Sequence, residues 1–255
     1  MSDKLSIVIA AYNESKRIIS TIAAVRGFFD SKHNDLNLLE VIVVSDGSGD
    51  DTVDLVKDYI DSFPDFPLQL IELSQNFGKG YAVKTWVGVA RGAYILFMDA
   101  DLSTPLTEIS KLRRSLDLGF GVAIDSMGLP DSEIIRHQAR YRELMGKVFN
   151  LMVRLLVIDG ICDTQWGFKL FRADVAKLVF RLLQSDRFDF DVEVLLIAQE
   201  LGFKIVEVPV IWQNSTCSTV SPLRDAWQMF LKLVNMKRRV QKNLISQGVK
   251  ARHES

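Results

Sequence analysis

Short apolar runs alternate with segments of helical period along the first hundred residues. Each run is nearly continuous in β-branched and other apolar side chains, and each ends in a polar or glycine-containing turn. Strands that are apolar at successive positions are typical of a parallel sheet covered by helices on both faces. The pattern predicts strands at Leu5–Ala10, Leu38–Val44, Leu68–Leu73 and Ala93–Met98, separated by helices at Glu14–Phe29, Asp51–Ser62 and Lys79–Ala90.

The alternation becomes less regular after Met98, where a helix is predicted to start near Pro105 because proline is favoured in the first turn. The later predicted strands are Gly121–Ile124, Gly167–Phe171 and Lys204–Ile211, and the later helices are Glu133–Val157, Ala173–Leu183, Phe190–Leu201 and Pro222–Leu244. No low-complexity linker divides the chain. We therefore expect residues 1–245 to form one α/β domain with a mostly parallel, doubly wound sheet, followed by a polar tail at 246–255.

Composition and charge exclude several classes of protein. The chain has 255 residues, 48% of them hydrophobic, which is incompatible with a disordered protein. Its 31 basic residues are balanced by 32 acidic ones, so it lacks the net positive charge of many nucleic-acid-binding proteins, and no nucleic-acid partner is expected. Two cysteines and three scattered histidines cannot build a disulfide framework or a Cys-based zinc site.

The sequence predicts neither a secretory signal nor a membrane-spanning segment. The N-terminus lacks a basic region followed by a long apolar one. No apolar stretch reaches the ~18 residues that a spanning helix needs, and the best candidate, Leu144–Ile158, is interrupted by Lys147 and Arg154. A cytoplasmic protein is therefore expected.

Polar side chains follow each of the first four predicted strands, where an open parallel sheet binds its ligands. Tyr12-Asn-Glu14 follows the first strand, Asp46 the second, Gly78-Lys79-Gly80 the third, and Asp99 and Asp101 the fourth. Two carboxylates at one strand end are hard oxygen ligands suited to Mg²⁺ or Mn²⁺, and such a metal commonly bridges to substrate phosphates. The alternative is that one acid caps the next helix and the other is solvated.

The other strand-end residues also have two interpretations. Asp46 could accept hydrogen bonds from a ribose or a base, or it could only shape a turn. Glu14 could bind the same ligand, or it could be a first-turn acid that the helix dipole favours. Lys79, between two glycines, could meet a phosphate. A dinucleotide fingerprint and a phosphate-binding P-loop are both missing, which disfavours a dehydrogenase or a P-loop NTPase.

Several of these segments match a known pattern. Ile7-Val-Ile-Ala-Ala-Tyr-Asn-Glu14, Val43-Val-Ser-Asp-Gly-Ser48 and Met98-Asp-Ala-Asp-Leu-Ser-Thr-Pro105 resemble the family 2 glycosyltransferases of GT-A fold. Asp163-Thr-Gln-Trp-Gly-Phe-Lys-Leu-Phe171 and Phe190-Asp-Val-Glu193 are similar to the dolichyl-phosphate β-glucosyltransferase branch. The resemblance extends from about Leu5 to Arg239.

The resemblance implies inverting transfer of a hexose from a nucleotide diphosphate sugar to a polyprenyl or dolichyl phosphate. Ser103, where mannosyl relatives usually have Gln, favours UDP-glucose as the donor. The implied roles are as follows: Tyr12, Glu14 and Asp46 hold the nucleoside; Asp99 and Asp101 hold ribose, metal and diphosphate; Asp163 lies at the junction of sugar and acceptor; and Lys79, Arg142 and Lys169 are the candidate cations for the phosphates.

The sequence departs from the family pattern at three positions. Met127 stands where the family usually has an arginine that meets phosphate, Ala10 replaces a frequent proline, and Trp166 replaces a cysteine. Because the arginine is missing, one alternative is that the protein binds nucleotide sugars but has only weak transferase activity. A GT-A enzyme acting on a glycan hydroxyl is another alternative, and it would need a base such as Asp163 or Asp191.

A lipid-phosphate acceptor would require contact with a membrane. The predicted helix from about Ile135 to Ile158 and the last predicted helix combine basic with apolar side chains, as interfacial helices do. Apolar core faces with solvated charges give the same pattern. We expect peripheral attachment at the cytoplasmic face, directly or through a membrane-protein partner.

Overall fold

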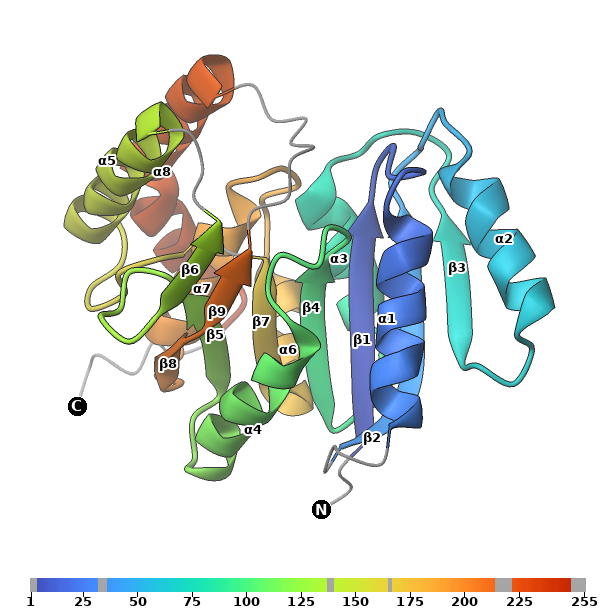
Figure 1. The fold of residues 1–255 in the computed structure, drawn as a ribbon. Helices are drawn as coiled ribbons and strands as arrows, with labels where there is room; N and C mark the ends of the chain where they lie inside the picture. Colours follow the sequence, from blue (N-terminus) through green and yellow to red (C-terminus); the bar gives the residue numbers. More distant parts are fainter. Residues whose placement is uncertain (1–3, 32–35, 137–139, 165–166, 214–221, 249–255) are drawn as a thin grey trace.

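The computed structural model describes residues 4–31, 36–136, 140–164, 167–213 and 222–248. A seven-stranded sheet crosses the molecule in the order β3-β2-β1-β4-β7-β5-β8, and β6 and β9 form a second, two-stranded sheet (Figure 1). The strands are β1 (Lys4–Ala11), β2 (Asn37–Ser45), β3 (Leu68–Glu72), β4 (Tyr94–Asp99), β5 (Val122–Ser126), β6 (Glu133–Arg136), β7 (Phe168–Arg172), β8 (Ile205–Pro209) and β9 (Ile211–Gln213). The helices are α1 (Ile18–Asp30), α2 (Thr52–Ser62), α3 (Lys79–Val87), α4 (Ile109–Asp117), α5 (Arg140–Leu156), α6 (Ala173–Leu182), α7 (Phe190–Glu200) and α8 (Pro222–Ser246), with a 3₁₀ turn at Leu106–Glu108.

The predicted mostly parallel sheet is confirmed. β3, β2, β1 and β4 are parallel, and β5 is parallel to β8, whereas β7 runs antiparallel to both β4 and β5. The chain proceeds from β1 to β2 and β3 on one side and then returns to β4 on the other. The strand order therefore reverses between β1 and β4, which is where open α/β sheets bind ligands.

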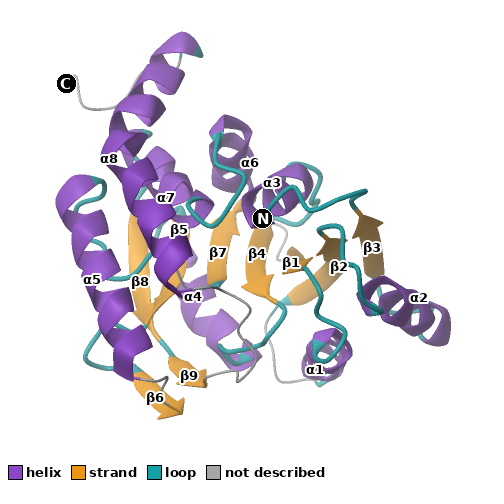
Figure 2. Ribbon diagram, turned by 90° about the horizontal axis from the view of Figure 1, so that it is seen from above, coloured by secondary structure: helices purple, strands orange, loops and turns teal. Residues whose placement is uncertain are grey.

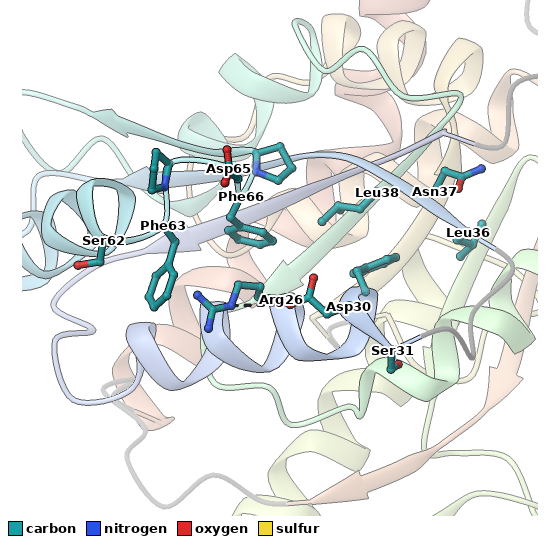
Figure 3. A pocket seen from close by; sticks show the side chains of 13 residues that line it. Arg26, Asp30, Ser31, Leu36, Asn37, Leu38, Ser62, Phe63, Asp65 and Phe66 are labelled. Carbon is teal, nitrogen blue, oxygen red and sulfur yellow. Dashed lines mark ion pairs between the residues drawn. The ribbon is translucent and has the colours of Figure 1, made fainter.

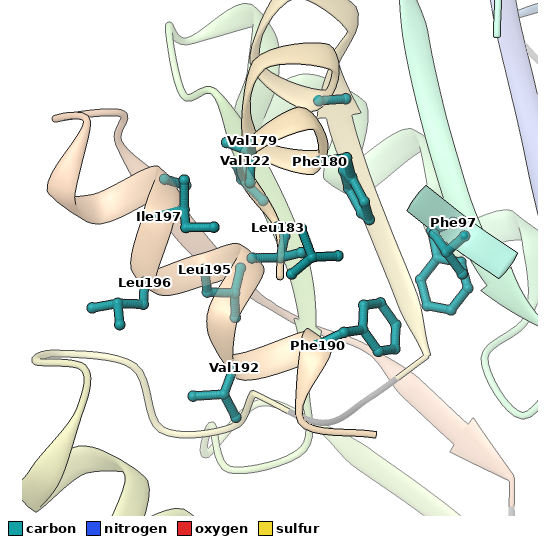
Figure 4. Packing of buried hydrophobic residues seen from close by; sticks show 14 of the residues in the cluster. Phe97, Val122, Val179, Phe180, Leu183, Phe190, Val192, Leu195, Leu196 and Ile197 are labelled. Carbon is teal, nitrogen blue, oxygen red and sulfur yellow. The ribbon is translucent and has the colours of Figure 1, made fainter. Parts of the chain in front are cut away.

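Helices cover both faces of the sheet and create two apolar cores (Figure 2). Successive side chains of β4 alternate between them, with Ile95 and Phe97 in one core and Leu96 and Met98 in the other. The ring of Phe97 meets that of Phe190 edge to face, with centroids 5.7 Å apart (Figure 4). Burial of β4 on both faces explains its continuous apolar sequence and fixes the position of the polar residues that follow.

The predicted single helix at Glu133–Val157 is wrong at its start. Glu133–Arg136 is the strand β6, which pairs parallel with β9, and α5 begins only at Arg140. Ile134 and Ile135 are β-branched and suit a strand whenever a partner is available. That partner comes from the predicted strand Lys204–Ile211, which the structure divides into β8 and β9.

Two predicted helices begin later than their patterns indicated. α1 starts at Ile18 instead of Glu14, because Asn13 adopts a left-handed conformation (φ 55°) and a turn closes from Arg17 N–H to the Glu14 carbonyl. Pro105 precedes the 3₁₀ turn, and α4 follows it. The other predicted elements agree with the structure to within a few residues. Among the described helices, none has the length and apolarity to cross a membrane.

Candidate active site

Asp99 and Lys79 form an ion pair at the reversal point of the sheet. Asp99 ends β4 beside β1, and Lys79 opens α3 with its Nζ 2.7 Å from Asp99 Oδ1. Burial alone would lower the pKa of Lys79, but the negative charges of Asp99, Asp191 and Asp101 outweigh burial and raise it. Lys79 is therefore a fixed cation, and it lies 5.1 Å from the centre of the Phe97 ring.

Gly167 covers the carboxylate of Asp99, a role that the sequence patterns did not reveal. Its carbonyl accepts the N–H of Asp99 at 2.9 Å. A Cβ at this position would lie 2.2 Å from the Asp99 carboxylate, so any other residue would force that carboxylate to move. The available signal was the single glycine that opens the predicted strand Gly167–Phe171.

Asp101 follows Asp99 in the turn after β4, where its Oδ1 accepts the N–H of Ser103 at 3.1 Å. Burial raises the pKa of Asp101, and the charge of Asp99 raises it further. Asp99 Oδ1 is buried and accepts no well-oriented hydrogen bond, although Lys79 is close to it. The repulsion between the carboxylates of Asp99 and Asp101, and the lack of a well-oriented hydrogen bond to Asp99 Oδ1, fit a divalent cation bound between these two side chains.

The protein would supply only part of such a metal site. Within the described ranges, no group of three or more His, Cys, Asp and Glu side chains is arranged to hold a metal ion. Two carboxylates fit a cation whose other ligands are water and the oxygens of a phosphate substrate, which is the usual mode for Mg²⁺.

A second polar group is buried where β5 and β7 meet α7. Lys169 Nζ lies 2.6 Å from Asp191 Oδ1, and both side chains are almost fully buried. Thr104 donates a hydrogen bond of 2.8 Å to Asp125 Oδ2. Burial raises the pKa of Asp125 to about 7, although the charge of Lys169 opposes the shift. The structure thus brings together Lys169, a candidate cation for the phosphates, and Asp191, a candidate base and acceptor residue.

Asp163 is buried in the loop before β7, and its Oδ1 accepts a hydrogen bond from Asn150 Nδ2 at 2.9 Å. The charge of Asp163 is one of the influences that raise the pKa of Asp125, so the two acids share one region. Met127 is half-buried directly after β5. Arg142 belongs to α5, but its side chain lies outside the described part, as does Trp166 altogether.

The residues proposed for the nucleoside lie at the ends of β1 and β2. Tyr12 is 44% exposed, and Glu14 forms an ion pair with Arg17. Asp46 is buried, and its two carboxylate oxygens accept the N–H groups of Phe77 and Gly78, each at 2.8 Å. Asp46 therefore fixes the loop that leads to Lys79, and its contact with a nucleoside stays a prediction.

A cavity of about 710 Å³ lies near the opposite ends of the strands, between α1, the start of β2 and the turn before β3 (Figure 3). Arg26 lines it and lies 3.6 Å above the ring of Phe63. None of the predicted site residues lines this cavity, so it is separate from the polar rim at Asp99.

Comparisons with known proteins show which family the chain belongs to. The pattern of the family described as "Glycosyl transferase family 2" matches residues 6–180. The chain is 35% identical to the dolichyl-phosphate beta-glucosyltransferase of Dictyostelium discoideum, over 91% of this chain and 73% of the relative. It is 34% identical to the human protein of the same name, over 89% of this chain and 72% of the relative.

Solved structures share the fold. Glucosyl-3-phosphoglycerate synthase from Mycobacterium tuberculosis in complex with UDP matches with a TM-score of 0.62 at 17% identity, covering 98% of this chain and 82% of that chain. Mannosyl-3-phosphoglycerate synthase from Rubrobacter xylanophilus matches with a TM-score of 0.63 at 18% identity, covering 98% and 76%. The predicted GT-A fold and glycosyltransferase class are thereby confirmed. From its sheet topology, its polar rim and its relatives, the chain belongs to glycosyl transferase family 2.

Proposed function

We propose that the protein transfers glucose from UDP-glucose to a polyprenyl or dolichyl phosphate, with inversion and with a divalent cation. The observation that carries this proposal is the rim of Asp99, Asp101 and Lys79 at the reversal point of the sheet. The 35% identity to a dolichyl-phosphate beta-glucosyltransferase supports the choice of donor and acceptor.

The charges at the rim suit a diphosphate leaving group. Asp99 keeps Lys79 protonated beside the place where phosphates would enter, and Asp101 forms no ion pair among the described residues. Bound Mg²⁺ or Mn²⁺ would supply charge neutralisation for the departing diphosphate. Asp99 and Asp101 are the residues that would hold it. A neighbour of the same fold was crystallised with Mn²⁺ and UDP-glucose.

The acceptor needs little activation. A phosphate monoester has a second pKa of about 6, so its nucleophilic oxygen is already largely ionised at neutral pH. The protein has to place two anions in line, and a general base is not required. Lys169 is paired with Asp191 inside the fold, so we assign these two residues to the support of Asp125 and Asp163 and not to direct contact with the acceptor phosphate.

A mixture of acceptors tests the proposal. Purified protein is incubated with a panel of nucleotide sugars, polyprenyl phosphate in vesicles, a soluble oligosaccharide and Mn²⁺ or Mg²⁺, and the products are identified by mass spectrometry. We expect a hexosyl-phosphoryl lipid from UDP-glucose. Transfer to the oligosaccharide alone would support the hydroxyl-directed alternative, and binding of UDP-glucose without turnover would support the weakly active one.

Two helices provide a surface for membrane attachment. α5 and α8 pack against each other, and their exposed side chains include apolar and basic ones. We place this surface against the cytoplasmic face of a membrane, since acidic lipids attract basic amphipathic helices. A membrane-protein partner stays a prediction. Among the described side chains of these two helices, the exposed large apolar ones are Val148, Leu151, Leu155 and Leu156 of α5 and Val234 and Ile245 of α8.

A further inference from the structure

The side chain of Glu207 connects β8 to the loop that carries Asp163. Glu207 Oε2 accepts the N–H of Cys162 at 2.8 Å, and Oε1 accepts the N–H of Asp163 at 3.0 Å. Ser126, at the end of β5, donates its hydroxyl to Oε1 at 2.7 Å. One carboxylate therefore joins the middle of β8 and the end of β5 to two successive amides of the loop.

The half-buried side chain of Glu207 lies on a face of the sheet that packs against an apolar core. Val206 and Val208 pack with one core and Ile205 with the other, so alternation along β8 directs Glu207 toward the core that α7 also enters. A charged group in such surroundings is retained only when hydrogen bonds compensate it. The three donors to Glu207 supply that compensation. Two of them are backbone N–H groups, so the carboxylate also fixes the position of the loop at Cys162 and Asp163.

A different element holds the side chain of Asp163. Asn150 of α5 donates from Nδ2 to Asp163 Oδ1, whereas Glu207 binds the backbone of the same residue. Asp163 thus has its main chain and its carboxylate fixed from two sides, by β8 and by α5. A loop residue that is held in this way is preorganised for a function that requires an accurate position.

We propose that Glu207 is a positioning residue for Asp163, which it serves by anchoring the backbone of Cys162 and Asp163. This inference rests on the proposed function, in which Asp163 lies at the junction of sugar and acceptor. Glu207 itself touches neither substrate. Its loss is expected to displace the Asp163 carboxylate while leaving the rim at Asp99 and Lys79 in place.

The test compares Glu207→Ala and Glu207→Gln with Glu200→Gln. Glu200 is a buried acid of α7 that accepts a hydrogen bond from Gln241 at 3.2 Å, so it undergoes the same chemical change away from Asp163. We expect kcat for glucosyl transfer to fall about ten- to hundredfold in Glu207→Ala, as misplacement of a catalytic group by about 1 Å does. The KM for UDP-glucose should stay unchanged.

Glu207→Gln is expected to lie between wild type and Glu207→Ala. Its amide oxygen can still accept some of the hydrogen bonds that Glu207 accepts. Its NH₂ group is a donor and cannot accept the bond from the backbone N–H that it faces. Hydrogen exchange supplies a readout that does not depend on activity: the amides of Cys162 and Asp163 should lose protection in both Glu207 variants and keep it in Glu200→Gln. If Glu207→Ala does not fold, the isosteric Gln variant decides by the same criteria.

The outcomes separate this inference from the proposed function. Normal kcat and normal protection of both amides in a folded Glu207 variant, together with loss of transfer in Asp163→Asn, would overturn the positioning role alone. Full transfer by Asp163→Asn would instead remove Asp163 from the proposed mechanism. A kcat that falls in Glu200→Gln as far as in Glu207→Gln would show that the effect is general and would also overturn the inference.

Discussion

At the scale of single residues, Asp101 occupies a site that disfavours its own charge. Burial and the neighbouring carboxylate of Asp99 raise the pKa of Asp101, so the ionised side chain costs stability at neutral pH. We therefore predict that Asp101→Ala abolishes glucosyl transfer, by about a hundredfold or more in kcat, without lowering the melting temperature of the metal-free protein. Steady-state kinetics and thermal melting measure the two effects.

Asp58→Ala, at an exposed position of α2, is the matched control and should change neither quantity. Wild-type transfer by Asp101→Ala would contradict the assigned role of the acid pair. A melting temperature well below that of wild type would instead show that Asp101 stabilises the turn after β4 through its hydrogen bond with Ser103, and that its charge does not lower stability.

The buried carboxyl of Asp125 gives stability a defined dependence on pH. Its pKa is raised by burial to about 7 in the folded state, from an unfolded value near ~4. The folded protein then holds a proton that the unfolded chain has lost, so this contribution to stability falls as the pH rises from about 4 to 7 and is constant above that range. Asp125→Asn carries no such proton.

We predict that Asp125→Asn melts at a higher temperature than wild type at pH 8 and that the difference shrinks toward pH 5. Melting curves at several pH values for both proteins check the sign. An unchanged difference between pH 5 and pH 8 would show that Asp125 is ionised across the whole range and is balanced by Lys169.

At the scale of the elements, the sequence predicted a strand correctly where the burial of that strand alone sets its pattern of apolar residues. β4 is apolar at successive positions because both of its faces are buried, and so its end and the place of Asp99 were predictable. β6 was not, since Ile134 and Ile135 fit a helix as well as a strand until β9 is placed beside them. The contacts of Glu207 and Gly167 depend on which strands become neighbours, and local patterns carry no such information.

Gly167 links β7 to the candidate site, because it directly precedes β7 and lies against the Asp99 carboxylate. We predict that Gly167→Ala destabilises the protein by about 1–3 kcal/mol and greatly lowers transfer, since the added Cβ would overlap the Asp99 carboxylate. Denaturant unfolding and the kcat for transfer measure both effects.

Gly27→Ala is the control for this substitution. Gly27 lies in α1, and a Cβ there would meet no atom within 4 Å. Alanine should stabilise the helix by up to about 1 kcal/mol and leave transfer unchanged. Equal unfolding free energies of Gly167→Ala and wild type would mean that the loop before β7 moves aside at little cost.

At the scale of the whole molecule, the fold places the proposed donor site and the proposed lipid surface on neighbouring parts of one body. The acid pair lies at the reversal point between β1 and β4, while α5 and α8 pack together beyond β5 and β8 (Figure 1). Asn150 belongs to α5 and binds Asp163, the residue that we propose for the junction of sugar and acceptor. A polyprenyl phosphate whose chain remains in the bilayer next to α5 would then have its headgroup near Asp163.

This arrangement predicts which apolar side chains meet the bilayer. Leu151 and Leu155 are 48% and 74% exposed and lie four residues apart on one face of α5. Full burial of a leucine is worth about 1.5–3 kcal/mol, so replacing both with glutamine should weaken binding to acidic-lipid vesicles by about tenfold or more. Transfer to polyprenyl phosphate in vesicles should fall in parallel, whereas UDP-glucose binding should not change.

Leu118→Gln, at an 81% exposed position after α4, makes the same chemical change elsewhere and should affect neither vesicle binding nor transfer. Vesicle sedimentation and calorimetry measure the two kinds of binding, and equal vesicle binding by the double variant and wild type would exclude this face of α5 as the membrane contact.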